Sequence, residues 1–230
     1  MKTHEKYLTL SSVYSGISSR CPEIQAYRLS FTACSLLSSY SADAIKLYVN
    51  IGDWEKVRQI ALADNLVQAR TFSSRKRITS ELVLRLKMLN VQELDLFINA
   101  TPQEQGYLLW LAICRCYGFV GDFACEVIHE NFINLKRIVS ADDYNVFFQK
   151  KVEWHPELGK LADSTKNKLR QTLFLIMREA GILDKNKEIL PACVSSQFRR
   201  HLASLDGRER MFLAIPFAWA NKISNNNDEY

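Results

Sequence analysis

Apolar residues recur at helical spacing along most of this chain. Two such stripes are Trp54, Val57, Ile60 and Ala61, and Ile78, Leu82, Leu86 and Leu89. Residues 107–117 are apolar on most sides, which predicts a helix at the centre of the protein. A further helix is expected from about Ser35 or Ser41 to Ile51, and others over 91–100, 119–139 and 141–154, with one or two short ones between 191 and 213. The pattern therefore predicts a protein that is nearly all α-helical.

Residues that favour helix ends mark several of these boundaries. Gly52 is expected to end the first helix, and Asp53 to cap the next one. Ser73 or Ser74 is expected to cap the helix that continues to Leu89. Pro102 stands where a first helical residue is expected, since proline is favoured there. Ser140 is predicted to cap the helix over 141–154.

The stretch 154–190 is predicted to hold a helix followed by a short hairpin. Asp163 or Ser164 can cap the helix, and Gly181 follows as its stop. The buried face of this helix is expected to contain Leu169, Leu173, Ile176 and Ala180. Beyond it, Ile182-Leu183, the polar turn 184–187 and Ile189-Leu190 predict a wing-like pair of strands.

These elements predict a fold that is all-α, with a helix-turn-helix-like element and the short β-hairpin near 182–190. Residues 1–30 are expected to form an irregular arm and residues 224–230 a disordered tail. Residues 31–100 are predicted to form one helical domain, with a basic helix over 74–89. Residues 101–223 are predicted to form a second domain, with a basic helix over 164–180. A single continuous bundle is nearly as compatible with the pattern.

Composition excludes several classes of protein. A hydrophobic content of 47% and a charged content of 24% are typical of a soluble globular protein. The longest strongly apolar run, 107–114, is far shorter than the ~20 residues that span a bilayer, and residues 1–10 lack the apolar region of a signal peptide. The six cysteines and four histidines show no metal-ligand spacing, so free thiols are expected. We therefore expect a cytoplasmic protein with no membrane span, metal or cofactor.

A basic block lies between residues 70 and 87. It contains one acid, Glu81, and six bases: Arg70, Arg75, Lys76, Arg77, Arg85 and Lys87. The expected cap places Arg75–Arg77 in the first helical turn, where the helix dipole disfavours cations. A bound phosphate would reverse that penalty. The helix expected over 53–64 precedes the block, as in DNA-reading helix pairs. The alternative is an ordinary solvated basic surface.

The helix over 164–180 is the second basic candidate. Lys166 and Arg170 lie one turn apart, and Lys168 is expected on the outer face. The alternative is a core helix with solubilising lysines. Most aromatic residues are expected to pack in the core, except that Phe174 falls near the polar side and is expected to meet the wing or a partner.

Signatures of catalysis are absent from the sequence. The eight glycines are dispersed, so no phosphate loop is formed. Glu126, His129 and Glu130 share a helix, but no further residue completes a metal site. We therefore predict no catalytic residues and no small-molecule substrate.

Four stretches together are similar to the BrxA family of BREX (bacteriophage exclusion) systems. They are GDWEKVRQIALADNLVQAR at 52–70, SSRKRI at 73–78, LLWLAICRCYGFVGDFACEVI at 108–128 and WHPELGKLADSTKNKLRQTLFLIMREAGILD at 154–184. The resemblance extends from about Phe31 to Pro191. It implies a small, helical, cytoplasmic bacterial protein that works with other BREX components and binds DNA. It also implies a partial likeness to RNA antitermination factors, and it supplies no catalytic residues.

The sequence thus predicts a non-enzymatic accessory protein of phage defence that binds double-stranded DNA through phosphate contacts. The predicted contacts are Arg70, Arg75, Lys76, Arg77, Lys87, Lys166, Lys168 and Arg170. Two alternatives stay open. One is a protein–protein adaptor that docks another BREX subunit through the apolar segment Met211–Trp219, and the other is an RNA-binding protein.

Overall fold

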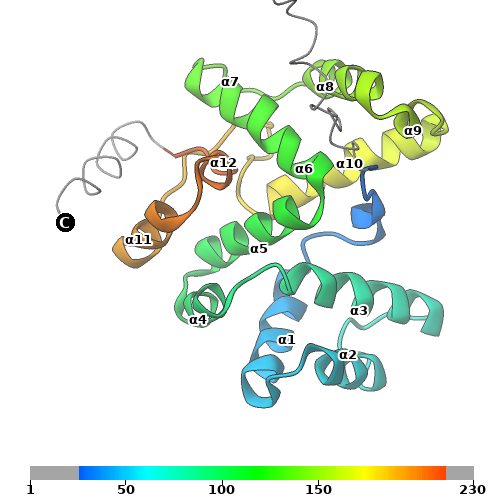
Figure 1. The fold of residues 1–230 in the computed structure, drawn as a ribbon, viewed down its shortest axis with the longest axis vertical. Helices are drawn as coiled ribbons and strands as arrows, with labels where there is room; N and C mark the ends of the chain where they lie inside the picture. Colours follow the sequence, from blue (N-terminus) through cyan, green and yellow to red (C-terminus); the bar gives the residue numbers. More distant parts are fainter. Residues whose placement is uncertain (1–25, 216–230) are drawn as a thin grey trace, which may run out of the picture.

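A computed structural model describes residues 26–215, and within that range every regular element is a helix (Figure 1). The elements are η1 (Ser30–Ala33), α1 (Ser38–Ile51), α2 (Trp54–Ala63), α3 (Phe72–Leu86), α4 (Val91–Asn99), α5 (Pro102–Cys116), α6 (Gly118–Phe123), η2 (Ala124–His129), α7 (Glu130–Ile133), α8 (Ala141–Trp154), α9 (Pro156–Gly159), α10 (Asp163–Glu179), α11 (Ser196–Ser204) and α12 (Gly207–Arg210). The all-α prediction is confirmed for this part of the chain. The predicted tail, and the predicted arm up to residue 25, lie outside it.

Helix α5 lies at the centre, as its apolar composition predicts. In Figure 1, α1–α3 lie on one side of it and α6–α10 on the other. Trp110 is fully buried, and its indole Nε1 donates to the carbonyl of Phe212 at 2.7 Å. Gly106 allows α10 to come close, since a Cβ there would lie 2.9 Å from the Ala180 carbonyl oxygen. The core on both sides of α5 forms one hydrophobic cluster.

Local sequence determines most helix boundaries. Gly52 ends α1 with φ at +72°, and Asp53 caps α2 by accepting from the Glu55 amide at 2.8 Å. Thr101 and Ser140 cap α5 and α8 in reciprocal capping boxes, with Glu104 and Asp143 as their partners. These predicted ends are confirmed.

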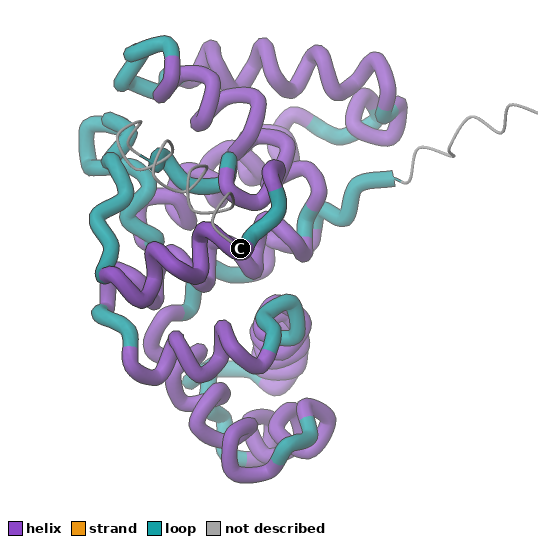
Figure 2. Tube along the Cα trace, turned by 60° about the vertical axis from the view of Figure 1, so that its left-hand side comes forward, coloured by secondary structure: helices purple, strands orange, loops and turns teal. Residues whose placement is uncertain are grey.

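The helix expected over 119–139 ends earlier, at Ile133. It begins after a bend of 115° from α5, and its middle third, η2, is π-helical. Figure 2 shows that the described residues alternate between helix and loop. Within residues 26–215, no single helix is long and apolar enough to cross a bilayer. Taken as a bent pair, α5 and residues 118–133 reach the required length and composition.

The predicted hairpin of strands at 182–190 does not form. Leu183 and Ile189 meet in an isolated antiparallel bridge, and no strand extends from it. Each arm is too short to build a ladder. The second arm forms backbone hydrogen bonds to two different segments. The Ile189 amide donates to the Arg137 carbonyl, and the Leu190 amide donates to the Ile182 carbonyl of the first arm. The segment is a tight turn held against the loop that follows α7.

Candidate nucleic-acid interface

The basic block begins at the N-terminus of α3, but the helix starts earlier than predicted. Thr71 is the cap, and its hydroxyl accepts from the Ser74 amide at 3.2 Å, so the prediction of Ser73 or Ser74 is wrong. Arg75, Lys76 and Arg77 become the fourth, fifth and sixth helical residues. They therefore lie beyond the first turn, where most of the dipole penalty acts. Folding tolerates these cations more readily than the sequence suggested.

The structure separates the six bases of the block into accessible and inaccessible ones. Arg70, Lys76, Arg77 and Lys87 are exposed. Arg75 is half-buried, and its Nη1 donates to the Leu62 carbonyl at 3.4 Å, which ties it to α2. Lys76 and Lys87, the residue that follows α3, lie on the same face, about 16 Å apart along the helix axis, since eleven residues complete about three turns. The accessible cations thus extend along the helix instead of forming one cluster.

Arg85 is structural. Its guanidinium is buried, with Nη1 donating to the Ser35 carbonyl at 2.5 Å and Nη2 to the Phe31 carbonyl at 3.2 Å. Tyr117 accepts from Arg85 Nε at 3.2 Å and donates to the buried carboxylate of Glu81. The single acid of the block and one of its bases therefore join η1 to α3 and α5. Because Glu81 and Arg85 are both buried, all the accessible charges of the basic block are positive.

Helix α10 carries the second set of bases. It starts at Asp163 without a side-chain cap, so the prediction that Asp163 or Ser164 caps it is wrong. Its end is confirmed, because Gly181 follows with φ at +71°. The expected apolar face is also confirmed, since all four of its residues, Leu169, Leu173, Ile176 and Ala180, are buried.

The three residues of α10 that were predicted to contact DNA lie on two different faces of the helix. Lys166 and Arg170, one turn apart, line a groove against α8, and Lys168 is exposed on a different face. Arg170 Nη2 donates to Asn167 Oδ1 at 3.2 Å, and Lys166 Nζ lies 3.3 Å from Asp163 Oδ1. The structure thus brings two of the three together.

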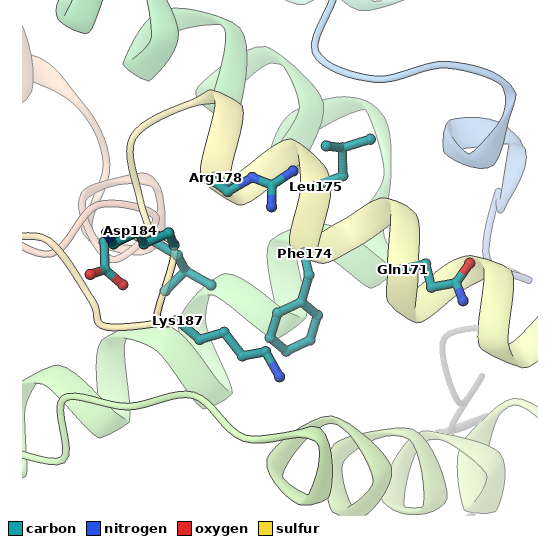
Figure 3. Close-up of a pocket in the computed structure, with 8 residues that line it drawn as sticks. Gln171, Phe174, Leu175, Arg178, Asp184 and Lys187 are labelled. Atoms are coloured by element: carbon teal, nitrogen blue, oxygen red, sulfur yellow. The ribbon is translucent and has the colours of Figure 1, made fainter.

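A second groove, of about 190 Å³, lies between α10 and the 184–187 turn (Figure 3). Phe174 projects into it from α10, and Lys187 Nζ lies 5.6 Å from its ring centroid, a cation–π distance. The expectation that Phe174 meets this segment is confirmed. The lining includes Arg178, Lys185 and Lys187, with Asp184 as its one acid. Lys185 and Lys187 were not among the predicted DNA contacts, because the sequence indicates only that they lie in the turn of a hairpin.

Asp184 shapes that turn. Its Oδ1 accepts from the Asn186 amide at 2.7 Å and from the Glu188 amide at 2.8 Å. Lys187 adopts a positive φ of 66°. Aspartate is well suited to this role because its short carboxylate bonds amides two residues onward. The turn holds exposed Lys185 and Lys187 beside α10.

The two basic helices begin on the same side of the molecule. Helix η1 packs against both α3 and α10, and in Figure 1 the N-terminal ends of α3 and α10 both lie on the right-hand side. The backbone amide of Leu36 donates to Glu179 Oε2 at 2.7 Å, which connects the chain after η1 to the end of α10. The sequence could not place the two sets of cations relative to one another.

Other predicted features have different outcomes. Phe212, Leu213 and Ala214 are buried, so this part of the apolar segment Met211–Trp219 is not an exposed docking site; residues 216–219 lie outside the described range. Glu126 receives a hydrogen bond from Lys151. In residues 26–215, no three histidine, cysteine or acidic side chains gather as metal ligands.

Two exposed aromatic residues were missed. Trp154, the last residue of α8, exposes 66% of its surface, so the expectation that it packs in the core is wrong. Phe72, the first residue of α3, exposes 65% of its surface and lies between Arg70 and the cations that follow. A large apolar side chain at a helix start is normally covered. The sequence shows that Phe72 lies close to Arg70, Lys76 and Arg77, but it does not show that the ring is exposed.

Comparison with known proteins identifies relatives. A family model described as BrxA matches residues 25–206. A "BREX protein BrxA" of Bacillus cereus (strain H3081.97) is 26% identical over 165 residues, which cover 70% of this chain and 82% of the relative. Another of that name, from Escherichia coli O9:H4 (strain HS), is 26% identical over 149 residues, covering 65% of this chain and 70% of the relative.

A solved structure shares the fold. The crystal structure of an uncharacterized protein from Magnetospirillum magneticum superposes with a TM-score of 0.69. The superposition covers 83% of this chain and 99% of the other, at 18% identity. At that identity the likeness concerns the arrangement of helices alone.

Proposed function

We propose that this chain, which belongs to the BrxA family, is a non-enzymatic component of a BREX system that binds duplex DNA in the cytoplasm. The single observation that carries the proposal is the exposed face of α3. It presents Lys76, Arg77 and Lys87, while the acid of the same block, Glu81, is buried. Two relatives bear the name of a BREX protein, which supports the system to which we assign it.

The mechanism is electrostatic. Cations along α3 neutralise phosphates, and the spacing of Lys76 and Lys87 on one face lets them reach both strands, one on either side of a groove. We propose α2 and α3, joined by residues 64–71, as a helix-turn-helix-like pair. Exposed Phe72 and half-buried Arg75 lie at the start of α3, just after this connection. Contacts of this kind position a protein without reading sequence.

The cations at the N-terminal end of α10 extend this surface. Both basic helices begin on one side of the molecule, with η1 packed against each of them. A duplex laid across that side would meet Lys76 and Arg77 at one end and Lys168 at the other. We propose that the two sets act on one DNA molecule. Other BREX proteins are the proposed protein partners.

The test is charge reversal on α3. Lys76→Glu with Arg77→Glu removes two exposed cations and leaves Arg75, which is bonded to α2, in place. We expect duplex affinity to fall at least tenfold at low salt. The slope of log K against log salt should become shallower by about 0.9 for each lost phosphate contact. Lys46→Glu, on exposed α1, is the matched control and should change the affinity little. Wild-type affinity that does not respond to salt would overturn the mechanism.

RNA binding is a second candidate, and Phe72 is the observation that favours it. An exposed aromatic ring beside cations can stack on an unpaired base. Competition between a duplex and a single-stranded RNA at fixed salt separates the two functions. For duplex binding, Phe72→Ala should leave the preference for duplex unchanged. For RNA binding, the wild type should prefer RNA and Phe72→Ala should abolish that preference.

A further inference from the structure

A small groove between α8 and α10 combines cations with a buried phenol. Its lining comes from two helices and consists of Tyr144, Asn145, Phe148, Gln149, Lys166, Asn167 and Arg170. Its volume is about 100 Å³. Sites for small organic ligands usually enclose roughly 300–1,000 Å³, so this groove suits one compact group. No acidic side chain is among its lining residues.

The Tyr144 hydroxyl is the unusual member of this groove. Tyr144 is 3% exposed, and its hydroxyl has no hydrogen-bond partner within the described residues. Buried hydroxyls are nearly always paired, because desolvation without a partner is unfavourable. Burial raises the pKa of Tyr144 well above its usual range, and the Arg170 charge opposes that rise. The phenol therefore stays protonated at neutral pH and can donate a hydrogen bond, and Arg170 is close enough to influence it.

The two cations of the groove keep their charge available. Arg170 lies 3.5 Å from Asn145 Oδ1 and 3.2 Å from Asn167 Oδ1, and both partners are neutral amides. Lys166 pairs with Asp163 at 3.3 Å, but the Asp163 side chain is 92% exposed, so water competes strongly for it. The two amides orient the guanidinium without neutralising it. The groove therefore presents one neutral hydrogen-bond donor, the Tyr144 hydroxyl, and two cations, Lys166 and Arg170, to a ligand.

We propose that this groove is a phosphate-binding subsite, in which Tyr144, Arg170 and Lys166 donate hydrogen bonds to one phosphate group. A phosphate has the size, the negative charge and the several acceptor oxygens that these donors require. The inference rests on the proposed function where the phosphate belongs to a duplex. A free or terminal phosphate would use the same donors.

The first experiment compares Tyr144→Phe with Arg170→Gln in duplex binding. Tyr144→Phe removes only the hydroxyl, and we expect a roughly tenfold loss of affinity with an unchanged salt slope, since no charge is lost. Arg170→Gln should weaken binding and make the slope shallower by about 0.9. Tyr48→Phe on α1 is the control and should bind like the wild type. The melting temperature of Tyr144→Phe should not fall, because its hydroxyl has no partner to lose.

The second experiment identifies the source of the phosphate and is independent of DNA binding. Inorganic phosphate, compared with chloride at matched ionic strength, should raise the melting temperature of the wild type more than that of Arg170→Gln. A linear duplex with 5′-phosphates and a duplex closed by hairpins at both ends then form the two DNA arms. An effect of Tyr144→Phe on both duplexes indicates a backbone phosphate, and an effect on the first alone indicates a terminal one.

The outcomes separate the two proposals. A wild type that does not bind a duplex overturns the proposed function, while a phosphate-specific stabilisation lost in Arg170→Gln still supports the subsite. A wild type that binds a duplex, with Tyr144→Phe binding equally well and no phosphate-specific stabilisation, overturns the subsite and leaves the proposed function intact.

Discussion

The guanidinium of Arg115 donates two hydrogen bonds to the buried carboxylate of Glu93, with Nη1 2.6 Å from Oε2 and Nη2 2.8 Å from Oε1. The Glu93 side chain is fully buried. Arg115 also pairs with Glu209, and His201 Nε2 lies 3.1 Å from Glu93 Oε1. The Glu93 carboxylate therefore joins α4 to α5 and α11, and Arg115 extends the connection to α12.

This arrangement predicts a loss of stability in acid. Burial raises the pKa of Glu93, but the hydrogen bonds from His201, Arg115 and the Asn90 amide outweigh it and lower the pKa to about 2. Because the folded pKa lies below the unfolded value, the stabilisation is complete above pH 4.5 and is lost as the pH falls toward 2. The contribution is about 3 kcal/mol. Urea unfolding of the wild type between pH 7 and 2 should show this decrease.

The control for that measurement is Glu93→Gln, which has no carboxylate to protonate. Its stability should be lower at pH 7 and should change less between pH 4.5 and 2 than that of the wild type. Other carboxylates with lowered pKa values, such as those of Asp122 and Asp143, titrate equally in both proteins. If the free energy of unfolding of the two proteins changed in parallel with pH, the loss of stability in acid would not come from Glu93.

Gly181→Ala should destabilise the end of α10. The positive φ is unfavourable for alanine by about 1–2 kcal/mol. The new Cβ would also lie 2.0 Å from Gln103 Nε2, which donates to the Ala180 carbonyl at 3.2 Å. We expect a total loss of about 2–3 kcal/mol, measured by urea unfolding. Gly207→Ala, where nothing lies within 4 Å, should have little effect. Equal losses for both variants would contradict this account.

Arg85→Gln tests whether a base of the block is structural. Its guanidinium bonds three backbone carbonyls and Tyr117, so we expect a loss of stability of about 3 kcal/mol or more. The salt slope of duplex binding should not change, because Arg85 is buried. Lys87→Gln, two residues away and exposed, should show the opposite pattern, with normal stability and a shallower slope. A shallower slope for Arg85→Gln, measured where the variant is folded, would place Arg85 at the interface.

Asp184→Ala tests the turn beside α10. The substitution removes the acceptor for the Asn186 and Glu188 amides, and we expect it to cost about 1–2 kcal/mol. Hydrogen exchange at these two amides should accelerate. Asp163→Ala is the matched control, because Asp163 is exposed and caps nothing. Unchanged protection at Asn186 in Asp184→Ala would mean that packing alone holds the turn.

Much of the fold follows from local sequence. Asp53, Thr101 and Ser140 begin their helices, and Gly52 and Gly181 end theirs, because capping depends on residues only a few positions apart. The same locality explains why the buried face of α10 was predicted correctly. Membership of the BrxA family was also indicated by the sequence, and the family comparison confirms it.

Tertiary packing decided the rest. Arg85 and Lys87 look alike in the sequence, yet the first is buried by η1 and α5 and the second is exposed. The 182–190 arms form one isolated bridge instead of two strands because each arm is short, and Ile189 also bonds to Arg137, more than fifty positions earlier. Tyr144 and Arg170 line one groove only because the fold places α8 beside α10. The sequence alone determined which segments become helices and where charge is concentrated. Packing between distant segments determined which charges stay accessible, because burial depends on neighbours that local spacing does not specify.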